Sequence, residues 1–397
     1  MRSICLITTG HISTDPRLIK EAVTLSKSGY LVHLIFTQYV AYQIDHDQHI
    51  LDQNPEWTYQ TLNWTGKSFI SKFNRLKSKF VALFSSNTDL SLNRNLHWQR
   101  KKALAYKADL YIAHNLGTLP VAVYAANKNN AKCGFDAEDF HRNEVSDEAG
   151  NTDVKLKTAL EEKYIPLVDY ITAASPQIAA KYGLLFNRDV IPVLNLFPKT
   201  GVPTIVNNIN DPLKLFWFSQ TIGPNRGLET IIEAGSISNI SLELHLLGNI
   251  TSEYEVQLQE LVRLKANKVK LVLHSPVYPE ELFKIAPQFD IGLAAEPYSP
   301  LNRDICLTNK IFTYIQCGLA VTASATSAQK ALIGQYPQTG RLYHNANELA
   351  QILIAYHQHR DVLYSTKIAC YQAGQTALNW ENEAEIFLST INKVIAA

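Results

Sequence analysis

Apolar and polar positions alternate along this chain in a pattern that predicts strands and helices in turn. An apolar run at 4–8 is followed by a polar turn at 10–17, apolar residues with helical spacing at 18–28, and a second apolar run at 31–36. Further short apolar runs come at 110–113, 133–137 and 170–173, with helical stretches between them. Strands that alternate with helices in this way are typical of a parallel, doubly wound sheet.

A second series of the same kind follows a stretch at 195–212 that contains prolines and two adjacent asparagines but little periodicity. We interpret that stretch as an interdomain linker. The second series has predicted strands at 214–219, 241–248, 269–274, 291–295 and 320–323, and predicted helices at 227–236 and 253–267. We therefore expect two α/β domains in tandem, each with a ligand-binding edge at the carboxyl ends of its strands.

The predicted domains cover 1–197 and 213–378, with the linker at 198–212 between them. The last helix, within 379–397, is predicted to return to the first domain. A length of 397 residues and a hydrophobic content of 46% fit two ordered domains with cores of their own.

Charge and cysteine usage narrow the class of protein. The formal net charge of +1 does not indicate nucleic acid as a partner. The five cysteines stand singly, with no CxxC pair, which favours a reducing compartment. The start, MRSICLITTG, reads as a first strand rather than a signal peptide, and no apolar run approaches the ~20 residues that a membrane-spanning helix needs. We therefore expect a cytoplasmic protein.

Candidate chemistry begins at the first turn, which reads GHISTDPR from Gly10 to Arg17. Gly10 would let the backbone turn closely, and the helix that follows could face an anionic or hydroxylated ligand with its N-terminus. The turn is not GxGxxG, so a dinucleotide site is poorly supported. The alternative is a tight turn in which Asp15 caps the helix.

Two further clusters follow predicted strands. The first contains His114, and the second, at 136–144, packs several acidic residues with His141 and Arg142 into nine positions. Such density at a strand end suits hydroxyl binding or general-base work, and it lacks the spacing of a metal site. A solvated acidic loop is the alternative for the second cluster.

In the second half, two basic residues stand at strand-to-helix turns. Arg226 lies in the turn at 219–227, and Lys310 follows Asn309 at the start of a short predicted helix that ends at Gly318. A cation beside a helix N-terminus, with a bidentate guanidinium nearby, is suited to holding a diphosphate. A surface arginine that caps a loop is the alternative for Arg226.

Five stretches of the chain resemble retaining glycosyltransferases of the GT-B fold, of the family 4 type: GHISTDPRLIKEA, AHNLGTLPVA, FDAEDFHRNE, FSQTIGPNRGLETIIEA and TNKIFTYIQCGLAV. They fall in the expected order and span nearly the whole chain. The resemblance implies a nucleotide-sugar donor on the C-terminal domain and an acceptor on the N-terminal domain. It also implies that a basic pair, here Arg226 and Lys310, holds the diphosphate without an essential metal. The nucleobase of the donor would lie near the turn His274-Ser275-Pro276-Val277.

The chain also departs from the family pattern. Members commonly carry two glutamates eight positions apart before the helix-ending glycine, but Ile305 and Thr313 occupy those positions here. Glu296 and Asp304 are also eight positions apart, but they do not lie at the family's distance from the helix-ending glycine, so we interpret their spacing as coincidence. Gln220 replaces a common arginine, and Glu138 stands where a catalytic-site histidine is usual.

A basic, aromatic-rich segment at 62–102 contains nine Lys or Arg residues and one acid, Asp89. Its aromatic and aliphatic residues recur at helical spacing. Two interpretations stay open: an ordinary domain helix, or an amphipathic helix at 67–84 that lies on an anionic membrane surface. Nucleic acid binding is the weaker rival because the segment has no such motif.

We therefore predict a retaining, metal-independent glycosyltransferase that uses no cofactor and takes a nucleotide-diphosphate sugar, with UDP or GDP as the favoured nucleotide. Its acceptor would be a glycan or a lipid-linked sugar of the cell envelope. A nucleotide-sugar 2-epimerase and a non-catalytic binding protein are the alternatives. The predicted roles are catalysis by Glu138, Asp139 and His141; diphosphate binding by Arg226, Lys310, Asn309 and Gly10; nucleotide or ribose binding by Thr313, Val277 and Ser275; and acceptor or sugar binding by His11, Asp15, Arg17, His114 and Asn302.

Overall fold

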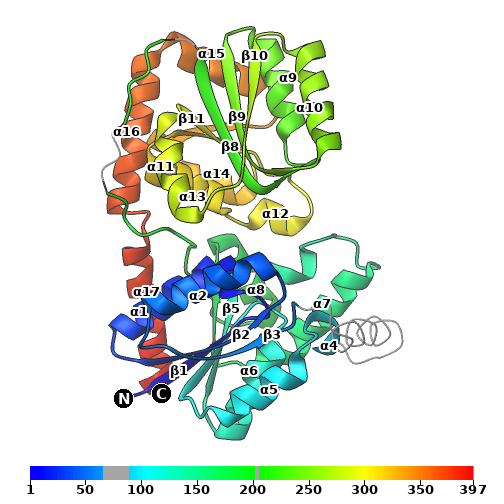
Figure 1. The fold of residues 1–397 in the computed structure, drawn as a ribbon, viewed down its shortest axis with the longest axis vertical. Coiled ribbons are helices and arrows are strands. Elements are labelled where there is room, and N and C mark those ends of the chain that lie inside the picture. Colours follow the sequence, from blue (N-terminus) through cyan, green and yellow to red (C-terminus); the bar gives the residue numbers. More distant parts are fainter. Residues whose placement is uncertain (66–88, 202–204, 211, 397) are drawn as a thin grey trace. The chain divides into compact units, whose positions relative to one another are not determined.

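The computed structural model describes residues 1–65, 89–201, 205–210 and 212–396. It divides into two compact units (Figure 1). Unit 1 contains Met1–Leu194 and Glu383–Ala397, and unit 2 contains Asn195–Asn382. The membrane interpretation of 67–84 concerns residues that lie outside the described ranges.

Unit 1 is built on a seven-stranded sheet with the order β3-β2-β1-β4-β5-β6-β7. Every pair of neighbouring strands is parallel. The chain runs outward from β1 in one direction to β2 and β3, and from β4 in the other, so the sheet is doubly wound. The strands are β1 (Ser3–Ile7), β2 (Leu31–Gln38), β3 (Thr58–Asn63), β4 (Leu110–His114), β5 (Lys132–Ala137), β6 (Tyr170–Ala173) and β7 (Ile191–Pro192).

The helices of unit 1 cover both faces of this sheet (Figure 1). Right-handed crossovers place α1, between β1 and β2, on the face opposite α6, between β4 and β5. The α-helices are α1 (Pro16–Lys27), α2 (Ile44–Gln53), α4 (Asp89–Leu92), α5 (Leu96–Ala105), α6 (Leu119–Asn129), α7 (Thr152–Tyr164) and α8 (Pro176–Phe186). Short 3-10 turns are η1 (Ile12–Thr14), η2 (Ala41–Gln43), η3 (His141–Asn143) and η4 (Ile165–Leu167).

The last helix, α17 (Trp380–Ala396), joins unit 1 from Glu383 onward. There the Glu383 carboxylate accepts a hydrogen bond from the backbone N–H of Leu194 at 2.7 Å. Near the end of the helix, the Arg2 side chain donates to the carbonyl of Ile395, which brings the two ends of the chain together (Figure 1).

Unit 2 contains a six-stranded sheet with the order β10-β9-β8-β11-β12-β13, again with parallel pairs. Large apolar side chains fill its core, among them Trp217, Leu244 and Leu293, each 0% exposed. The strands are β8 (Leu213–Ile222), β9 (Leu242–Ile250), β10 (Val269–His274), β11 (Ile291–Ala294), β12 (Ala320–Ser324) and β13 (Gly340–Tyr343).

The helices of unit 2 follow its strands in the same alternation. They are α9 (Leu228–Ser238), α10 (Ser252–Lys265), α11 (Pro279–Ile285), α12 (Leu301–Ile305), α13 (Asn309–Cys317), α14 (Ser327–Gln335), α15 (Ala346–Gln358) and α16 (Arg360–Thr376), with 3-10 turns η5 (Ala286–Gln288) and η6 (Pro337–Thr339). Gly318 ends α13 in the left-handed conformation, φ 66° and ψ 41°, which confirms the predicted helix stop.

The sequence pattern predicted the central strands of both sheets and missed three at the edges, β3, β7 and β13. β3 alternates exposed and half-buried positions, and β7 has only two residues. An edge strand has a neighbour on one side only and need not carry a continuous apolar run. That is why these strands gave no signal.

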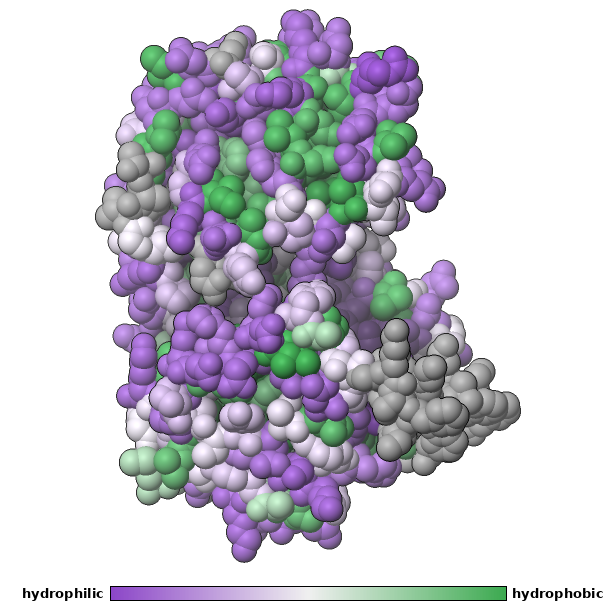
Figure 2. Space-filling model, viewed as in Figure 1, coloured by the Kyte–Doolittle hydropathy of each residue, from purple (hydrophilic) through white to green (hydrophobic). Residues whose placement is uncertain are grey.

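Hydrophilic side chains cover most of the face shown in Figure 2, with hydrophobic residues in small groups between them. Within the described ranges, no helix combines the length and the apolar character that crossing a bilayer demands. The five cysteines are free thiols and all are buried.

Candidate functional site

Each doubly wound sheet has one point where the chain leaves a pair of central strands in opposite directions. In unit 1 this point lies between β1 and β4, and in unit 2 between β8 and β11. Open α/β sheets bind ligands outside the carboxyl ends of their strands at such a point. In unit 1 the two strand ends are joined there by the Asn115 side-chain amide, which donates to the Thr8 hydroxyl at 3.2 Å.

The loop after β1 is fixed by its own polar side chains. Asp15 caps α1, because its carboxylate accepts from the backbone N–H of Leu18 at 3.0 Å. Gly10 does not have a positive φ, and a Cβ there would make an ordinary 3.4 Å contact with the ring of Tyr39. The turn itself thus has no steric need for glycine at position 10, and diphosphate binding by Gly10 stays a prediction.

His11 uses both ring nitrogens inside unit 1. Its Nε2 accepts from the backbone N–H groups of Tyr39 and Val40, each at 2.9 Å. The proton must then sit on Nδ1, which lies 2.6 Å from a carboxylate oxygen of Asp47. His11 thus ties the β1–α1 loop to α2, and acceptor binding by His11 stays a prediction that would require one of these contacts to break.

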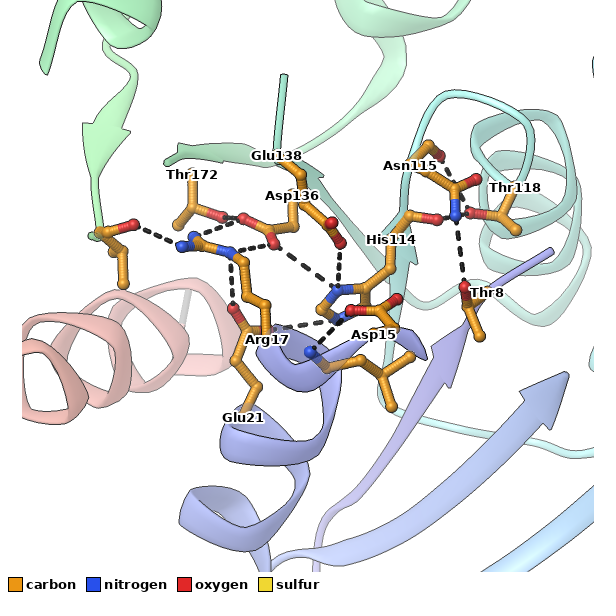
Figure 3. A network of polar contacts seen from close by, with 12 residues as sticks. Thr8, Asp15, Arg17, Glu21, His114, Asn115, Thr118, Asp136, Glu138 and Thr172 are labelled. Carbon is orange, nitrogen blue, oxygen red and sulfur yellow. Dashed lines mark hydrogen bonds and ion pairs between the residues drawn. The ribbon is translucent and has the colours of Figure 1, made fainter. Parts of the chain in front are cut away.

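A buried ion pair crosses from α1 to the end of β5 (Figure 3). The guanidinium of Arg17 is bidentate on the Asp136 carboxylate, with Nη2 at 2.7 Å from Oδ1. Thr172 donates to the same carboxylate at 2.6 Å. Burial alone would raise the pKa of Asp136, but Arg17 more than offsets burial and lowers it below its usual value.

His114, at the end of β4, lies at the centre of this network with its ring fully buried (Figure 3). Its Nε2 is 3.3 Å from Glu21 on α1, and its Nδ1 is 3.5 Å from Asp136 and 3.5 Å from Glu138. Burial favours the neutral ring, but the surrounding carboxylates raise the pKa of His114 well above its ordinary value. The imidazole is therefore held as a cation.

Glu138 is the member of the network that a ligand can reach, since 29% of its side chain is exposed while the His114 ring has none. Asp15 lies nearby at the helix cap. Burial, together with the charge of Glu138, raises the pKa of Asp15 to about 7. This edge of unit 1 thus presents one half-exposed carboxylate and several buried groups that hold protons near neutral pH, an arrangement suited to binding and orienting a hydroxyl.

Two triads here bring ligand-type atoms within 4.8 Å of one another: Asp15, His114 and Glu138, and Glu21, His114 and Asp136. Such a spacing could surround a cation. The guanidinium of Arg17 already occupies Asp136, and the protonated ring of His114 faces the other carboxylates. We therefore assign these residues no metal ion.

His141 belongs to a separate cluster, although it follows Glu138 by three positions. Its Nδ1 lies 3.4 Å from the Glu144 carboxylate, which in turn is 2.6 Å from the ammonium of Lys157. Burial lowers the pKa of His141, but Glu144 reverses this and raises it. Asp139 is half-buried, and its carbonyl faces the Tyr182 hydroxyl at 3.4 Å. Glu138 is thus the predicted catalytic residue that contacts the His114 network.

In unit 2 the turn that carries Arg226 packs against the end of β11. Gly227 has φ +77°, and a Cβ built on it would lie 2.9 Å from the Cβ of Ala295. Only glycine allows this close approach. Arg226 itself is half-buried, and its Nη1 lies 3.4 Å from the hydroxyl of Ser219, which is within β8. The guanidinium is therefore held at the β8–β11 edge, and most of its N–H donors have no partner among the described residues.

Lys310 is anchored by Glu296, the residue whose spacing we had interpreted as coincidence. Its Nζ is 2.6 Å from the Glu296 carboxylate and 5.6 Å from the ring centroid of Trp217. Thr308 donates to the same carboxylate at 2.9 Å. Burial raises the pKa of Glu296, but Lys310 outweighs burial and lowers it. Glu296 is thus an ionised carboxylate that positions the lysine.

The backbone on either side of Glu296 is held by Ser324 at the end of β12. The Glu296 N–H donates to the Ser324 hydroxyl at 2.9 Å, and that hydroxyl donates to the Glu296 carbonyl at 2.8 Å. α13 begins beside this loop, and no side chain caps its first turn. Its first N–H groups can therefore serve an anion.

The remaining predicted residues of unit 2 lie around this edge in different environments. Thr313 is 0% exposed on α13, and its hydroxyl has no hydrogen-bond partner among the described residues. Asn302 is buried on α12, and Asn309 accepts from the Asn195 amide at 3.0 Å. Ser275 is exposed and Val277 half-buried in the loop after β10. Nucleotide or ribose binding by Thr313, Ser275 and Val277 stays a prediction. So do diphosphate binding by Asn309 and acceptor or sugar binding by Asn302.

Sequence reasoning missed two residues that shape these sites, Glu21 and Glu296. Glu21 lies one helical turn after Arg17 on the buried side of α1, and a pair of charges among apolar neighbours at that spacing was the available signal. Glu296 is separated from Lys310 by fourteen positions, so only the fold brings the two together.

Comparison with known proteins shows the fold. No family profile matches the chain, and no curated protein matches it in sequence. Sucrose-phosphate synthase of Thermosynechococcus elongatus has a similar structure, with a TM-score of 0.72, 14% identity and 100% of both chains covered. HepE of Anabaena, solved with UDP and glucose, has a TM-score of 0.69 and 14% identity over 99% of this chain and 100% of its own.

A TarM variant of S. aureus, solved with Fondaparinux, α-GlcNAc-glycerol and UDP, aligns with a TM-score of 0.70 and 10% identity over 98% of this chain and 99% of its own. Identities this low establish architecture and leave activity open. The chain has the GT-B fold, two Rossmann-like units with parallel sheets of seven and six strands.

Proposed function

We propose that this protein is a glycosyltransferase that takes its sugar from a nucleoside-diphosphate sugar bound to unit 2. The observation that carries this proposal is the pair of cations at the β8–β11 edge. Arg226 is held beside Ala295 by the glycine turn, and Lys310 is anchored on Glu296 one residue further along. Together with the uncapped start of α13, they offer charge and hydrogen-bond donors suited to a diphosphate.

The same groups would act in the reaction. When the bond between the sugar's anomeric carbon and the diphosphate oxygen breaks, negative charge grows on the leaving group. Arg226 and Lys310 would stabilise that charge, which lowers the barrier. We propose a retaining reaction like that of family 4 enzymes, in which the acceptor hydroxyl attacks from the same face and its proton passes to the departing phosphate. This scheme requires no protein nucleophile and no essential metal.

Unit 1 would bind the acceptor at the β1–β4 edge. Beside that edge, after β5, Glu138 has a half-exposed carboxylate that can accept a hydrogen bond from an acceptor hydroxyl. HepE and TarM were solved with UDP, so UDP-sugars are the first donors to test. We further propose a cytoplasmic enzyme that acts on glycan or lipid-linked acceptors of the cell envelope.

A thermal-shift panel of UDP, GDP, ADP, TDP and CMP tests the proposal. We expect one nucleoside diphosphate to raise the melting temperature, because a ligand that binds only the folded state stabilises it. Stabilisation by none of them would overturn the donor assignment. An altered free sugar formed without an acceptor would instead identify a 2-epimerase, and binding without any turnover would identify a non-catalytic protein.

Substitutions locate the site. Arg226→Ala should abolish the shift with little effect on the ligand-free melting temperature, since Arg226 makes one long contact with Ser219. Lys310→Ala should abolish the shift too. Because this variant leaves the Glu296 carboxylate buried without its cation, its melting temperature without ligand must be measured first. Arg263→Ala is the matched control, because Arg263 lies in unit 2 and pairs with Glu260 at the surface of α10.

A further inference from the structure

Glu21 is a fully buried carboxylate whose position the proposed function does not yet use. It lies on α1, one turn after Arg17, with the Arg17 Nε at 3.7 Å. Burial and the charge of Asp136 raise the pKa of Glu21, whereas the contacts with His114 and Arg17 act in the opposite direction and favour the ionised form. Isolated buried carboxylates are costly, so a residue of this kind is kept where its charge has a partner.

That partner is the ring of His114. Glu21 lies 3.3 Å from Nε2, on one side of the imidazole, and Glu138 lies 3.5 Å from Nδ1 on the other (Figure 3). The His114 imidazole therefore lies between two carboxylates, the buried one of Glu21 on α1 and the half-exposed one of Glu138 after β5. Of the two carboxylates, only Glu138 can reach a ligand.

We propose that Glu21 is a positioning residue that acts through His114: it keeps a proton on Nε2, so that the doubly protonated ring holds the Glu138 carboxylate oriented toward the acceptor. The inference rests on the proposed function for its effect on catalysis. The contact between Glu21 and His114 can be tested without it.

Other charges face the same ring and are common to the wild type and its variants. On α1 these are Asp15, Arg17 and Lys20, and on β5 it is Asp136. Burial and the neighbouring Arg17 lower the pKa of Lys20 to about 7. Tyr170 on β6 and Glu383 on α17 adjoin Glu21 and Arg17 respectively. Because Glu21 also raises the pKa of Lys20, the titration of the His114 ring itself is the primary readout.

The decisive variant is Glu21→Gln, which keeps the shape of the side chain and removes its charge. We expect the titration of the His114 ring, followed by NMR and assigned with His114→Gln, to move to lower pH. We also expect kcat/KM relative to the wild type to change little below the pKa of His114 in the variant, where the ring is protonated in both proteins, and to fall by up to about tenfold per pH unit above it, until the wild-type ring titrates as well. EDTA is present throughout.

Glu161→Gln is the matched control, since Glu161 is an equally buried glutamate of unit 1 that accepts from Arg142 and Tyr182. It should leave the His114 titration unchanged and give a ratio that does not depend on pH. The inference is overturned if Glu21→Gln leaves the His114 titration in place, or if its activity loss is the same on both sides of the pH at which its own His114 ring titrates. If the wild type transfers no sugar, the proposed function fails, and the NMR titration alone decides whether Glu21 holds the proton.

Discussion

At the scale of single residues, the ionisable groups of unit 1 divide by how each charge is neutralised. Asp136 stays ionised because the guanidinium of Arg17 faces it. At Asp15 the hydrogen bond of the helix cap does not offset burial, which favours the neutral form. Glu144 has two cationic neighbours, His141 and Lys157. These differences decide which groups change charge near neutral pH and which change only in acid.

Glu144 makes this testable through the pH dependence of stability. His141 and Lys157 outweigh burial and lower the pKa of Glu144 to about 2. A lowered folded pKa contributes stability that is present above the unfolded pKa and lost as pH falls through the folded one. His141 also titrates in this range, so the comparison is made in the His141→Gln background, where Lys157 still lowers the pKa of the Glu144 carboxyl. There we expect Glu144→Gln to lower the free energy of unfolding by more at pH 7 than at pH 3. Urea denaturation at both pH values measures it, and a difference that is constant or grows in acid would contradict the assignment.

Part of the residue-level picture was visible in the sequence. The capping role of Asp15 was one of two interpretations of the first turn, and the structure shows that cap. The partners of His11, Lys310 and His114 were not predictable, because each lies on a different element and is brought near only by the packing of the sheets. Local spacing carries information about helix faces and turns, and very little about contacts between distant segments.

At the scale of elements, the turn between β8 and α9 determines whether Arg226 reaches its place. Gly227 gives the turn a positive φ and lets its backbone approach Ala295, at the end of β11. The strands β8 and β11 were predictable from their apolar runs, since central strands are buried on both faces. The edge strands β3, β7 and β13 were not, and neither was the contact of this turn with β11.

Gly227→Ala should therefore damage the donor site. A Cβ at this position meets both the strain of a left-handed backbone and a 2.9 Å contact with Ala295. We expect a loss of about 1–2 kcal/mol in the free energy of unfolding and a clear weakening of nucleoside-diphosphate binding, measured by denaturation and calorimetry.

Gly223→Ala is the control for this prediction, because Gly223 lies in the same turn with nothing within 4 Å of a Cβ and no positive φ. It should leave both quantities near the wild type. Equal effects of the two substitutions would show that the close approach to Ala295 does not position Arg226.

At the scale of the whole molecule, the two units differ in the charge of their candidate sites. Unit 1 presents a carboxylate at its switch point, and unit 2 presents two cations. That division fits an acceptor hydroxyl on the first and a donor diphosphate on the second. The GT-B architecture followed from the alternation of strands and helices together with the five resembling stretches. The sugar, the acceptor and the linkage depend on contacts that a sequence pattern does not encode.

The charge of unit 2 also predicts how the proposed transferase responds to metal removal. Since Arg226 and Lys310 would supply the positive charge that a divalent ion supplies in metal-dependent transferases, we expect sugar transfer to keep its rate in excess EDTA. The measurement is release of nucleoside diphosphate in the presence of acceptor, with and without chelator. A rate that falls with EDTA and returns with Mg²⁺ or Mn²⁺ would contradict the assignment.

The most direct test of the donor site is calorimetric titration of the intact protein with UDP and with UMP, or with GDP and GMP if guanine nucleotides give the larger thermal shift. The two ligands differ only in the phosphate that Arg226 and Lys310 are proposed to hold. We predict that the diphosphate binds at least about tenfold more tightly, a difference of about 1.4 kcal/mol, and that Arg226→Ala removes the advantage. Equal affinity for diphosphate and monophosphate in the wild type, or an advantage that survives in Arg226→Ala, would contradict the account.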